Sequence, residues 1–220
     1  MDNTPNNSVS ALLGRTDIYL IDQIMKGRYE QSDKILDAGC GGGRNMHWFV
    51  QNNVDIYGID SSEAAIENLR NEYPSLPSKN LQVAFIEDLP FTDNFFDHVL
   101  SSAVLHFAAN AAHFKEMIGE MVRVLKPGGT LFIRMTSDIG IEDKVKLLPN
   151  GNHLVPDGSM RFLLTKPLLA ECLRQFNVSF SEPLKTVNVD DMRCMSTLML
   201  QKNDLFQKGG IGNQEIRFDR

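Results

Sequence analysis

Four glycines stand within five positions of the segment ILDAGCGGGRN (Ile35–Asn45), directly after a short apolar run. Glycine loses more backbone entropy on folding than any other residue, so such a cluster is expected only where the chain must turn sharply or touch a ligand. A plain tight turn needs one or two glycines. The cluster therefore predicts a loop at the end of a buried strand whose backbone contacts a nucleotide-type ligand.

Apolar runs and helical patterns alternate along residues 34–135. The runs predict strands at 34–38, 54–59, 81–86, 98–103 and 130–135, with helices at 44–51, after Asp60 and at 112–125. The sequence KPGG after the last helix predicts a stop and a turn. Strands that alternate with helices form βαβ units, so we predict an α/β fold with a mainly parallel, doubly wound sheet.

The segments on either side of this core have different patterns. Residues 9–27 repeat apolar side chains at helical spacing and predict one helix or two short ones. Residues 137–160 are rich in glycine and proline and predict a long loop, which in compact domains is functional or mobile. Thr165 is placed to cap a helix that ends near 176. Two strands near 178–189 and 193–201 are predicted to form an antiparallel pair at the sheet edge.

Composition narrows the functional classes. The 220 residues carry a formal charge of −6, which argues against binding to duplex nucleic acid. The three cysteines, Cys40, Cys172 and Cys194, are far apart and odd in number, so neither a disulfide framework nor a metal site is expected. The sequence has no signal-peptide pattern and no apolar run long enough to span a bilayer, so we expect a cytoplasmic protein without membrane partners.

Asp60 ends the second predicted strand, about 20 residues beyond the glycines. An acid at this place can accept hydrogen bonds from ribose hydroxyls, although it would equally serve as the N-cap of the helix that follows. The pair of features favours an adenosine-containing ligand, either NAD(P) or S-adenosylmethionine. The glycines match neither a P-loop nor the dinucleotide pattern G-x-G-x-x-G, because position 44 is Arg.

Four segments taken together resemble the successive signature blocks of class I S-adenosylmethionine-dependent methyltransferases. They read ILDAGCGGGRN, DIYGIDSSEAAIENLR, EDLPFTDNFFDHVLSSAVLHF and MVRVLKPGGTLFI, in the order and spacing of that family. The resemblance implies a Rossmann-like doubly wound sheet of seven strands, mostly parallel with the last strand antiparallel. It also implies one domain over residues 1–202: an N-terminal helical cap (1–33), a cofactor-binding core (34–135) and a substrate-side loop, helix and edge strands (136–202). Residues 203–220 are expected to form a disordered tail.

The resemblance also implies which residues bind the cofactor. Gly39, Cys40 and Gly41 would pack against its methionine and ribose part, Asp37 would orient its amino group, Asp60 with Ser61 would bind the ribose, and Ser101 would lie near the reactive methyl group. Many relatives bind the adenine amino group with an Asp four residues before the Leu-Pro pair. Phe85 stands there in this chain, so we expect Phe85 or Ile86 to hold the adenine by packing and Glu87 to supply the acid.

The methyl acceptor is harder to predict. His106, which follows the fourth strand, is either a catalytic base or a packed histidine, and His153 in the long loop is expected to be exposed to solvent. The first block and residues 160–202 also resemble tellurite-resistance methyltransferases, which would imply an oxyanion neutralised by Arg44, Arg161 or Arg193; each arginine would equally suit an ordinary ion pair. The LPF block resembles instead the broad family that methylates quinones, sterols and other metabolites. We therefore expect a small-molecule acceptor.

Two other functions remain open at this point: a cofactor-binding protein without turnover, and an NAD-dependent oxidoreductase, which the glycine spacing disfavours. The sequence is compatible with a monomer or a homodimer. The N-terminal helix and the long loop are expected to bracket the cofactor cleft and to exclude water from it. Arg15, Asp17 and Tyr19 stand out in the N-terminal segment, because they mix charge and apolar surface more than simple burial requires.

Overall fold

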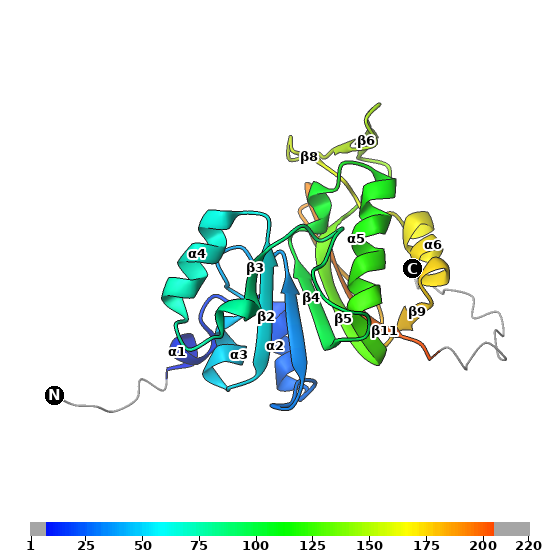
Figure 1. The fold of residues 1–220 in the computed structure, drawn as a ribbon. Coiled ribbons are helices and arrows are strands. Elements are labelled where there is room, and N and C mark those ends of the chain that lie inside the picture. The colour runs from blue at the N-terminus through cyan, green and yellow to red at the C-terminus, as the bar shows by residue number, and fades with distance from the viewer. Residues whose placement is uncertain (1–7, 205–220) are drawn as a thin grey trace.

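The computed structural model describes residues 8–204 as a layered α/β fold around one large sheet (Figure 1). Five strands form its parallel part: β1 (Lys34–Ala38), β2 (Asp55–Asp60), β3 (Leu81–Val83), β4 (Phe96–Ser102) and β5 (Leu125–Ser137). Their order across the sheet is β5-β4-β1-β2-β3. The predicted doubly wound α/β architecture is confirmed. Most of the predicted tail, 205–220, lies outside the described residues.

The last strand is antiparallel, as predicted. β11 (Arg193–Lys202) pairs antiparallel with β5, while β9 (Val178–Phe180) and β10 (Lys185–Val189) pair with the two halves of its other edge. Eight strands thus fill seven positions in the sheet. The single strand predicted over 178–189 is interrupted at residues 181–184, where Pro183 has no N–H to donate to a ladder.

Helices cover both faces of the sheet. Those with regular α geometry are α1 (Val9–Leu13), α2 (Ile18–Met25), α3 (His47–Gln51), α4 (Glu63–Glu72), α5 (Ala111–Val124) and α6 (Lys166–Gln175), with short 3-10 turns at Ser78–Asn80 and Leu105–Phe107. The N-terminal pattern forms two short helices, and Thr165 caps α6 as predicted. The helix expected from residue 44 begins only at His47, and its N-cap residue makes no side-chain hydrogen bond.

Two apolar layers follow from the alternation of side chains along the strands. In β1, Ile35 packs into the layer beneath α2, α3 and α4, whereas Leu36 packs into the layer beneath α5 and α6. Phe132 and Ile133 alternate in the same way in β5. Because neighbouring residues of a strand point to opposite faces, a strand covered on both sides is apolar throughout. This double cover explains the uninterrupted apolar runs of the sequence.

The KPGG segment lies inside β5 and does not form a separate turn between α5 and this strand. The prediction of a turn here is therefore wrong. The pairing of β4 with β5 shifts register between Phe96 and His98, opposite this segment. Gly128 has a φ of +77°, and a Cβ on Gly129 would lie 2.7 Å from the carbonyl oxygen of Asp97. The two glycines therefore permit a β-bulge at the start of the strand.

The long loop predicted over 137–160 contains regular structure. Three short strands, β6 (Lys146–Leu147), β7 (His153–Leu154) and β8 (Met160–Arg161), form a second antiparallel sheet that stands beyond the end of α5 at the top of Figure 1. It has its own small core of Ile141, Val155, Leu163 and Cys194. His153, expected to be exposed, is half-buried in β7.

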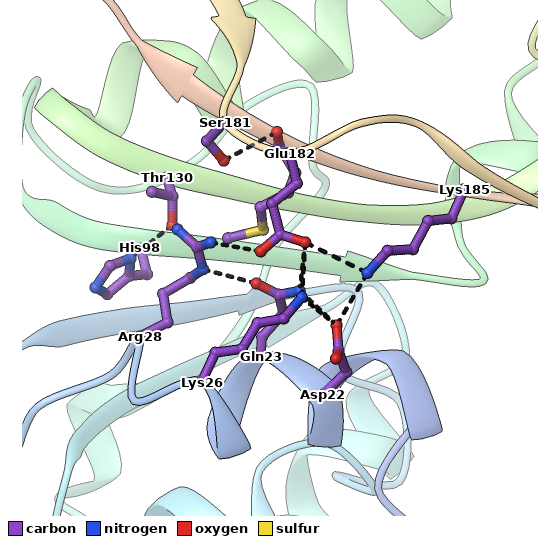
Figure 2. A network of polar contacts seen from close by, with 10 residues as sticks. Asp22, Gln23, Lys26, Arg28, His98, Thr130, Ser181, Glu182 and Lys185 are labelled. Carbon is purple, nitrogen blue, oxygen red and sulfur yellow. Dashed lines mark hydrogen bonds and ion pairs between the residues drawn. The ribbon is translucent and has the colours of Figure 1, made fainter. Parts of the chain in front are cut away.

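A polar network attaches α2 to the edge of the sheet (Figure 2). Its members are Asp22, Gln23, Lys26, Arg28, Glu182 and Lys185. Glu182, between β9 and β10, accepts hydrogen bonds from Arg28 at 2.7 Å and from Lys26 at 2.8 Å. Its side chain is 16% exposed, so these ion pairs are partly shielded from water.

We expect the Glu182 network to stabilise the fold in a pH-dependent way. Burial acts to raise the pKa of Glu182, but hydrogen bonds from Lys26, Arg28 and Gln23 outweigh it and hold the pKa at about 2. A carboxyl with a lowered folded-state pKa contributes stability above its unfolded pKa of about 4.3 and loses it as the pH falls towards the folded value.

Wild-type protein is therefore expected to exceed Glu182→Gln in unfolding free energy by about 1–2 kcal/mol at pH 7. The difference should shrink between about pH 4 and pH 2, where the native carboxyl takes up its proton. Urea unfolding of both proteins across this range measures the effect. A difference that stays constant from pH 7 to pH 2 would contradict the assignment.

Candidate functional site

A cavity of about 1020 Å³ opens at the carboxyl ends of the parallel strands. β2 and β4 flank β1 on opposite sides, so the chain changes direction across the sheet at this point, where doubly wound folds bind ligands. Its lining comprises Arg15, Gly39, Cys40, Gly41, Gly42, Arg44, Asn45, Ile59, Asp60, Ser61, Ala84, Phe85, Ile86, Glu87, Ser102, Ala103, Val104, Phe107, His113 and Met117. The volume is at the upper end of the usual range for a drug-sized ligand, about 300–1000 Å³, so it has room for a cofactor and a small second ligand.

The glycine loop forms the floor of this cavity. Gly39, at φ +80°, could not carry a Cβ without approaching Val104 to 2.5 Å. Gly41, at φ +49°, and Gly42 have nothing within 4 Å of a Cβ position, because that space is the cavity itself. The N–H groups of Gly39 and Cys40 both donate to the carbonyl of Ile59 at 2.9 Å, which fixes the loop to β2. The backbone is therefore bare and held in place where a ligand would lie.

Asp60 connects the end of β2 to the glycine loop. One carboxylate oxygen accepts from the N–H of Gly41 at 2.9 Å and the other from the N–H of Ser62 at 2.9 Å. Each oxygen can accept a further hydrogen bond, so the carboxylate remains available to a ligand hydroxyl. Asp60 is not the N-cap of α4: Ser62 takes that role, accepting from the N–H of Ala65 at 3.2 Å.

Most residues predicted to bind a cofactor lie together in the cavity. They are Gly39, Cys40, Gly41, Asp60, Ser61, Ile86 and Glu87. Asp37 and Ser101 are buried beneath its wall and do not line it. Burial raises the pKa of Asp37 to about 7, against a smaller lowering effect of Arg44. The hydroxyl of Ser101 is buried without a partner among the described residues, and the next residue, Ser102, is the one that reaches the cavity.

The region after β3 combines aromatic and polar groups. Phe85, which takes the place of an acid in the resembled family, lines the cavity with 61% of its surface exposed. The imidazole Nε2 of His113 lies 3.2 Å from Glu87 Oε1, and its Nδ1 accepts from the N–H of Ala109 at 3.1 Å. Since Nδ1 accepts, the tautomer with its proton on Nε2 is favoured, although Nε2 makes no hydrogen bond within the described residues. His113 carries no signal in the sequence, because it lies on α5, far along the chain from the glycine loop.

The residues predicted to handle the acceptor are not gathered at one point. Arg44 lines the cavity and donates to the hydroxyl of Ser102 at 3.0 Å. Arg161, on β8, lies outside the lining with its guanidinium carbon 5.3 Å from the ring centre of Phe107, which does line it. Arg193, exposed on β11, is paired with Val189 of β10. The three arginines thus do not form a single anion site.

His106 is buried beside the cavity and does not line it. Burial, with a smaller effect of Arg161, lowers the pKa of His106 to about 4, so the imidazole is neutral at pH 7. Its Nδ1 has no hydrogen-bond partner within the described residues. A neutral imidazole can accept a proton, so the chemistry of a base is present, although one residue away from the cavity wall.

The ends of β4 and β5 show how the backbone shapes this wall. Ala103 follows β4 with a φ of +64°, a conformation that residues other than glycine seldom adopt. Its N–H donates to the carbonyl of Arg134 at 2.8 Å, which stabilises the unusual turn. The turn places Val104 against Gly39. Strained backbone of this kind is frequent at ligand sites.

Two kinds of feature were not found in the part of the chain that is described. Residues 8–204 contain no group of three His, Cys, Asp or Glu side chains that could hold a metal ion. The same residues contain no helix that is both long and apolar enough to cross a bilayer.

Part of the chain is similar to known proteins. Residues 36–133 match the family described as a methyltransferase domain. The chain is 34% identical over 96 residues to an uncharacterized methyltransferase of Synechocystis, covering 44% of this chain and 43% of that protein. It is 35% identical over 140 residues to a ubiquinone/menaquinone biosynthesis C-methyltransferase of Neisseria meningitidis, covering 57% and 55%. It is also 32% identical over 124 residues to a tRNA N(3)-cytidine methyltransferase of Xenopus tropicalis, covering 52% and 35%. The chain thus spans about half or less of the length of these relatives.

Solved structures agree with the architecture. A S-adenosylmethionine-dependent methyltransferase of Methanosarcina mazei superposes with a TM-score of 0.64 at 19% sequence identity, covering 82% of this chain and 97% of that one. At this identity the likeness establishes a shared fold. The sheet order and the antiparallel last strand described above are therefore features of a known architecture.

Proposed function

We propose that this chain, whose residues 36–133 match a methyltransferase domain, is a class I S-adenosylmethionine-dependent enzyme that transfers a methyl group from S-adenosylmethionine to a small-molecule acceptor. The observation that carries the proposal is the bond between Asp60 and the N–H of Gly41 at the cavity floor. It joins a bare glycine backbone to an acid suited to ribose hydroxyls, in one cavity.

The residues present fit this cofactor. A Cβ at Gly41 or Gly42 would occupy the space that the ligand needs, and Asp60 has free acceptor capacity. Apolar contact for the adenine would come from Phe85 and Ile86, both in the lining. S-adenosylmethionine brings a methyl group already activated on a sulfonium. The chain then has to orient an acceptor, exclude water and, for some acceptors, accept a proton.

A small-molecule acceptor is favoured over a nucleic acid. The relatives named above include a quinone-pathway methyltransferase and a tRNA methyltransferase, so family likeness alone does not choose between them. The formal charge of −6 opposes binding to a polyanion. The cavity is large enough for a cofactor with a metabolite-sized partner. A quinone-like metabolite or a small oxyanion would fit this description.

Calorimetric titration with S-adenosylmethionine, S-adenosylhomocysteine and NAD in parallel tests the cofactor. We expect micromolar affinity for the first two and no binding of NAD. Transfer of labelled methyl groups from the loaded protein to a panel of quinols, phenols, amines and chalcogen oxyanions then tests turnover. Cofactor binding with no transfer to any acceptor would favour a non-catalytic binding protein, and binding of NAD alone would favour an oxidoreductase.

The catalytic role of His106 can be tested once an acceptor is known. If His106 is the base, His106→Gln is expected to lower kcat by about 10²–10⁴-fold, the usual contribution of general-base catalysis, with cofactor affinity unchanged. In wild type, kcat should fall as the pH drops through about 4, where His106 becomes charged. An unchanged kcat in the variant would assign His106 to packing beneath Phe107.

A further inference from the structure

The turn between α1 and α2 is fixed to the glycine loop on the C-terminal side of Arg15. The hydroxyl of Thr16 donates to the carbonyl of Leu13 at 2.6 Å and approaches the carbonyl of Arg44 at 3.2 Å. The N–H of Asp17 donates to the side-chain oxygen of Asn45 at 3.0 Å. Because Thr16 and Asp17 are buried and bonded to residues near the cavity, the position of Arg15 at the cavity wall is set by the fold.

Asp17 anchors this turn to the ends of two strands. Its side chain has 0% exposure, and its Oδ2 accepts from Arg134 at 2.6 Å, from Ser102 at 3.3 Å and from Arg44 at 3.4 Å. Its Oδ1 caps α2 through the N–H of Tyr19 at 3.0 Å. The buried carboxylate is therefore shared mainly with Arg134, and the longer contact leaves Arg44 only partly neutralised.

Two arginines of the cavity lining therefore have N–H groups that make no hydrogen bond within the described residues. The guanidinium of Arg15 is exposed and makes no hydrogen bond or ion pair with the described part of the chain. Arg44 uses one nitrogen, Nη2, for Ser102 and Asp17, and its side chain is 40% exposed. A guanidinium carries five N–H donors and matches the geometry of oxyanions.

Few carboxylates oppose these cations. Asp17 is shared mainly with Arg134, and Asp60, which keeps its negative charge, accepts from the N–H groups of Gly41 and Ser62 and is not bonded to either arginine. Asp37, the other acid close to Arg44, is buried, which raises its pKa to about 7 and leaves it partly protonated at neutral pH. Glu87 lies further along the wall, beside His113. Within the described residues, therefore, no carboxylate is bonded to Arg15, and only the shared Asp17 is bonded to Arg44.

We propose that Arg15 and Arg44 together form a binding site for an oxyanion at the glycine-loop end of the cavity. The inference rests on the proposed function and deepens it, since two oxyanions could occupy the site. One is the carboxylate of the cofactor, whose adenine the proposed function assigns to Phe85 and Ile86. The other is an anionic acceptor held beside the cofactor. In either case the N-terminal cap contributes directly to ligand binding.

Calorimetry on the full chain distinguishes these sources. S-adenosylhomocysteine is compared with its decarboxylated analogue, 5′-deoxy-5′-(3-aminopropylthio)adenosine, and selenite is titrated into the protein with and without S-adenosylhomocysteine. The proteins are wild type, Arg15→Gln, Arg15→Lys and the control Arg174→Gln, which removes an exposed arginine of α6 away from the cavity. Thermal unfolding verifies that each variant is folded.

If the site holds the cofactor carboxylate, the affinity of wild type for S-adenosylhomocysteine should exceed its affinity for the analogue by about tenfold or more. This is the scale of a charge-assisted hydrogen bond. Arg15→Gln should erase this preference, Arg15→Lys should restore part of it, and the control should keep it. If the site holds an anionic acceptor instead, wild type should bind both adenosine compounds with equal affinity, and Arg15→Gln should lose selenite binding.

The proposal is overturned if Arg15→Gln changes neither the preference between the two adenosine compounds nor the affinity for selenite. Failure of the proposed function gives a different result, because wild type would then bind neither adenosine compound. Selenite binding that depends on Arg15 in that situation would keep the oxyanion site and remove the methyltransferase assignment. Absence of both kinds of binding would reject both proposals.

Discussion

Replacing Asp60 with alanine is expected to weaken S-adenosylmethionine binding by about 1–3 kcal/mol, which corresponds to roughly five- to 150-fold in Kd. Two losses add up in this variant. The ribose hydroxyls lose a charged acceptor, and the N–H of Gly41, bonded to Asp60 at 2.9 Å, is released from its fixed place in the cavity floor. Isothermal titration with S-adenosylmethionine and S-adenosylhomocysteine measures the change directly.

Two further variants separate these contributions. Asp60→Asn keeps one oxygen that can accept from Gly41 but removes the charge, so its affinity should fall between those of wild type and Asp60→Ala. Glu63→Ala removes an exposed acid from the first turn of α4 and should leave affinity within about twofold of wild type, because exposed charges are screened by water and salt. Equal affinities of wild type and Asp60→Ala would reject the ribose assignment.

Much of the frame of this site could be predicted because it depends on local patterns. β1 begins and ends where the apolar run predicts, since both of its faces are covered by helices. The place of Asp60 at a strand end follows from the same alternation of strands and helices. A glycine cluster also leaves few other options, since several of these residues have positive φ values.

Contacts between distant segments could not be predicted. His113 reaches the cavity from α5, far from the glycine loop in sequence, and no local pattern signals that it lies at this wall. Arg15, which stands out in the sequence, reaches the cavity from the turn between α1 and α2, and its place beside Arg44 depends on long-range contacts of its neighbours. The sequence predicts a loop where the small sheet after β5 lies, because the strands of this sheet are two residues long, too short for an alternating pattern. Ser101 and Ser102 are adjacent and chemically identical, so only the pleat of β4 decides which one faces the cavity.

Gly39→Ala is expected to lower the unfolding free energy by about 2–4 kcal/mol, from a left-handed backbone penalty combined with overpacking. The native φ of Gly39 is +80°, and the new Cβ would lie 2.5 Å and 2.8 Å from the two methyl groups of Val104. Gly27→Ala is the matched control: its φ is +68°, but nothing lies within 4 Å of its Cβ position. It should cost about 1 kcal/mol, because it carries the backbone penalty alone. Urea unfolding without ligand measures both.

Val104→Ala tests whether contact with Val104 makes Gly39→Ala more destabilising than Gly27→Ala. Removing both methyl groups leaves only the Val104 Cβ, 3.1 Å from the added methyl of Gly39→Ala. The double variant should therefore be more stable than the sum of the two single effects by about 1 kcal/mol or more, as expected for residues in direct contact. Strict additivity would mean that the cost of Gly39→Ala is backbone strain alone. Coupling would show instead that Gly39 is glycine because the chain after β4 must pack against the loop that forms the cavity floor.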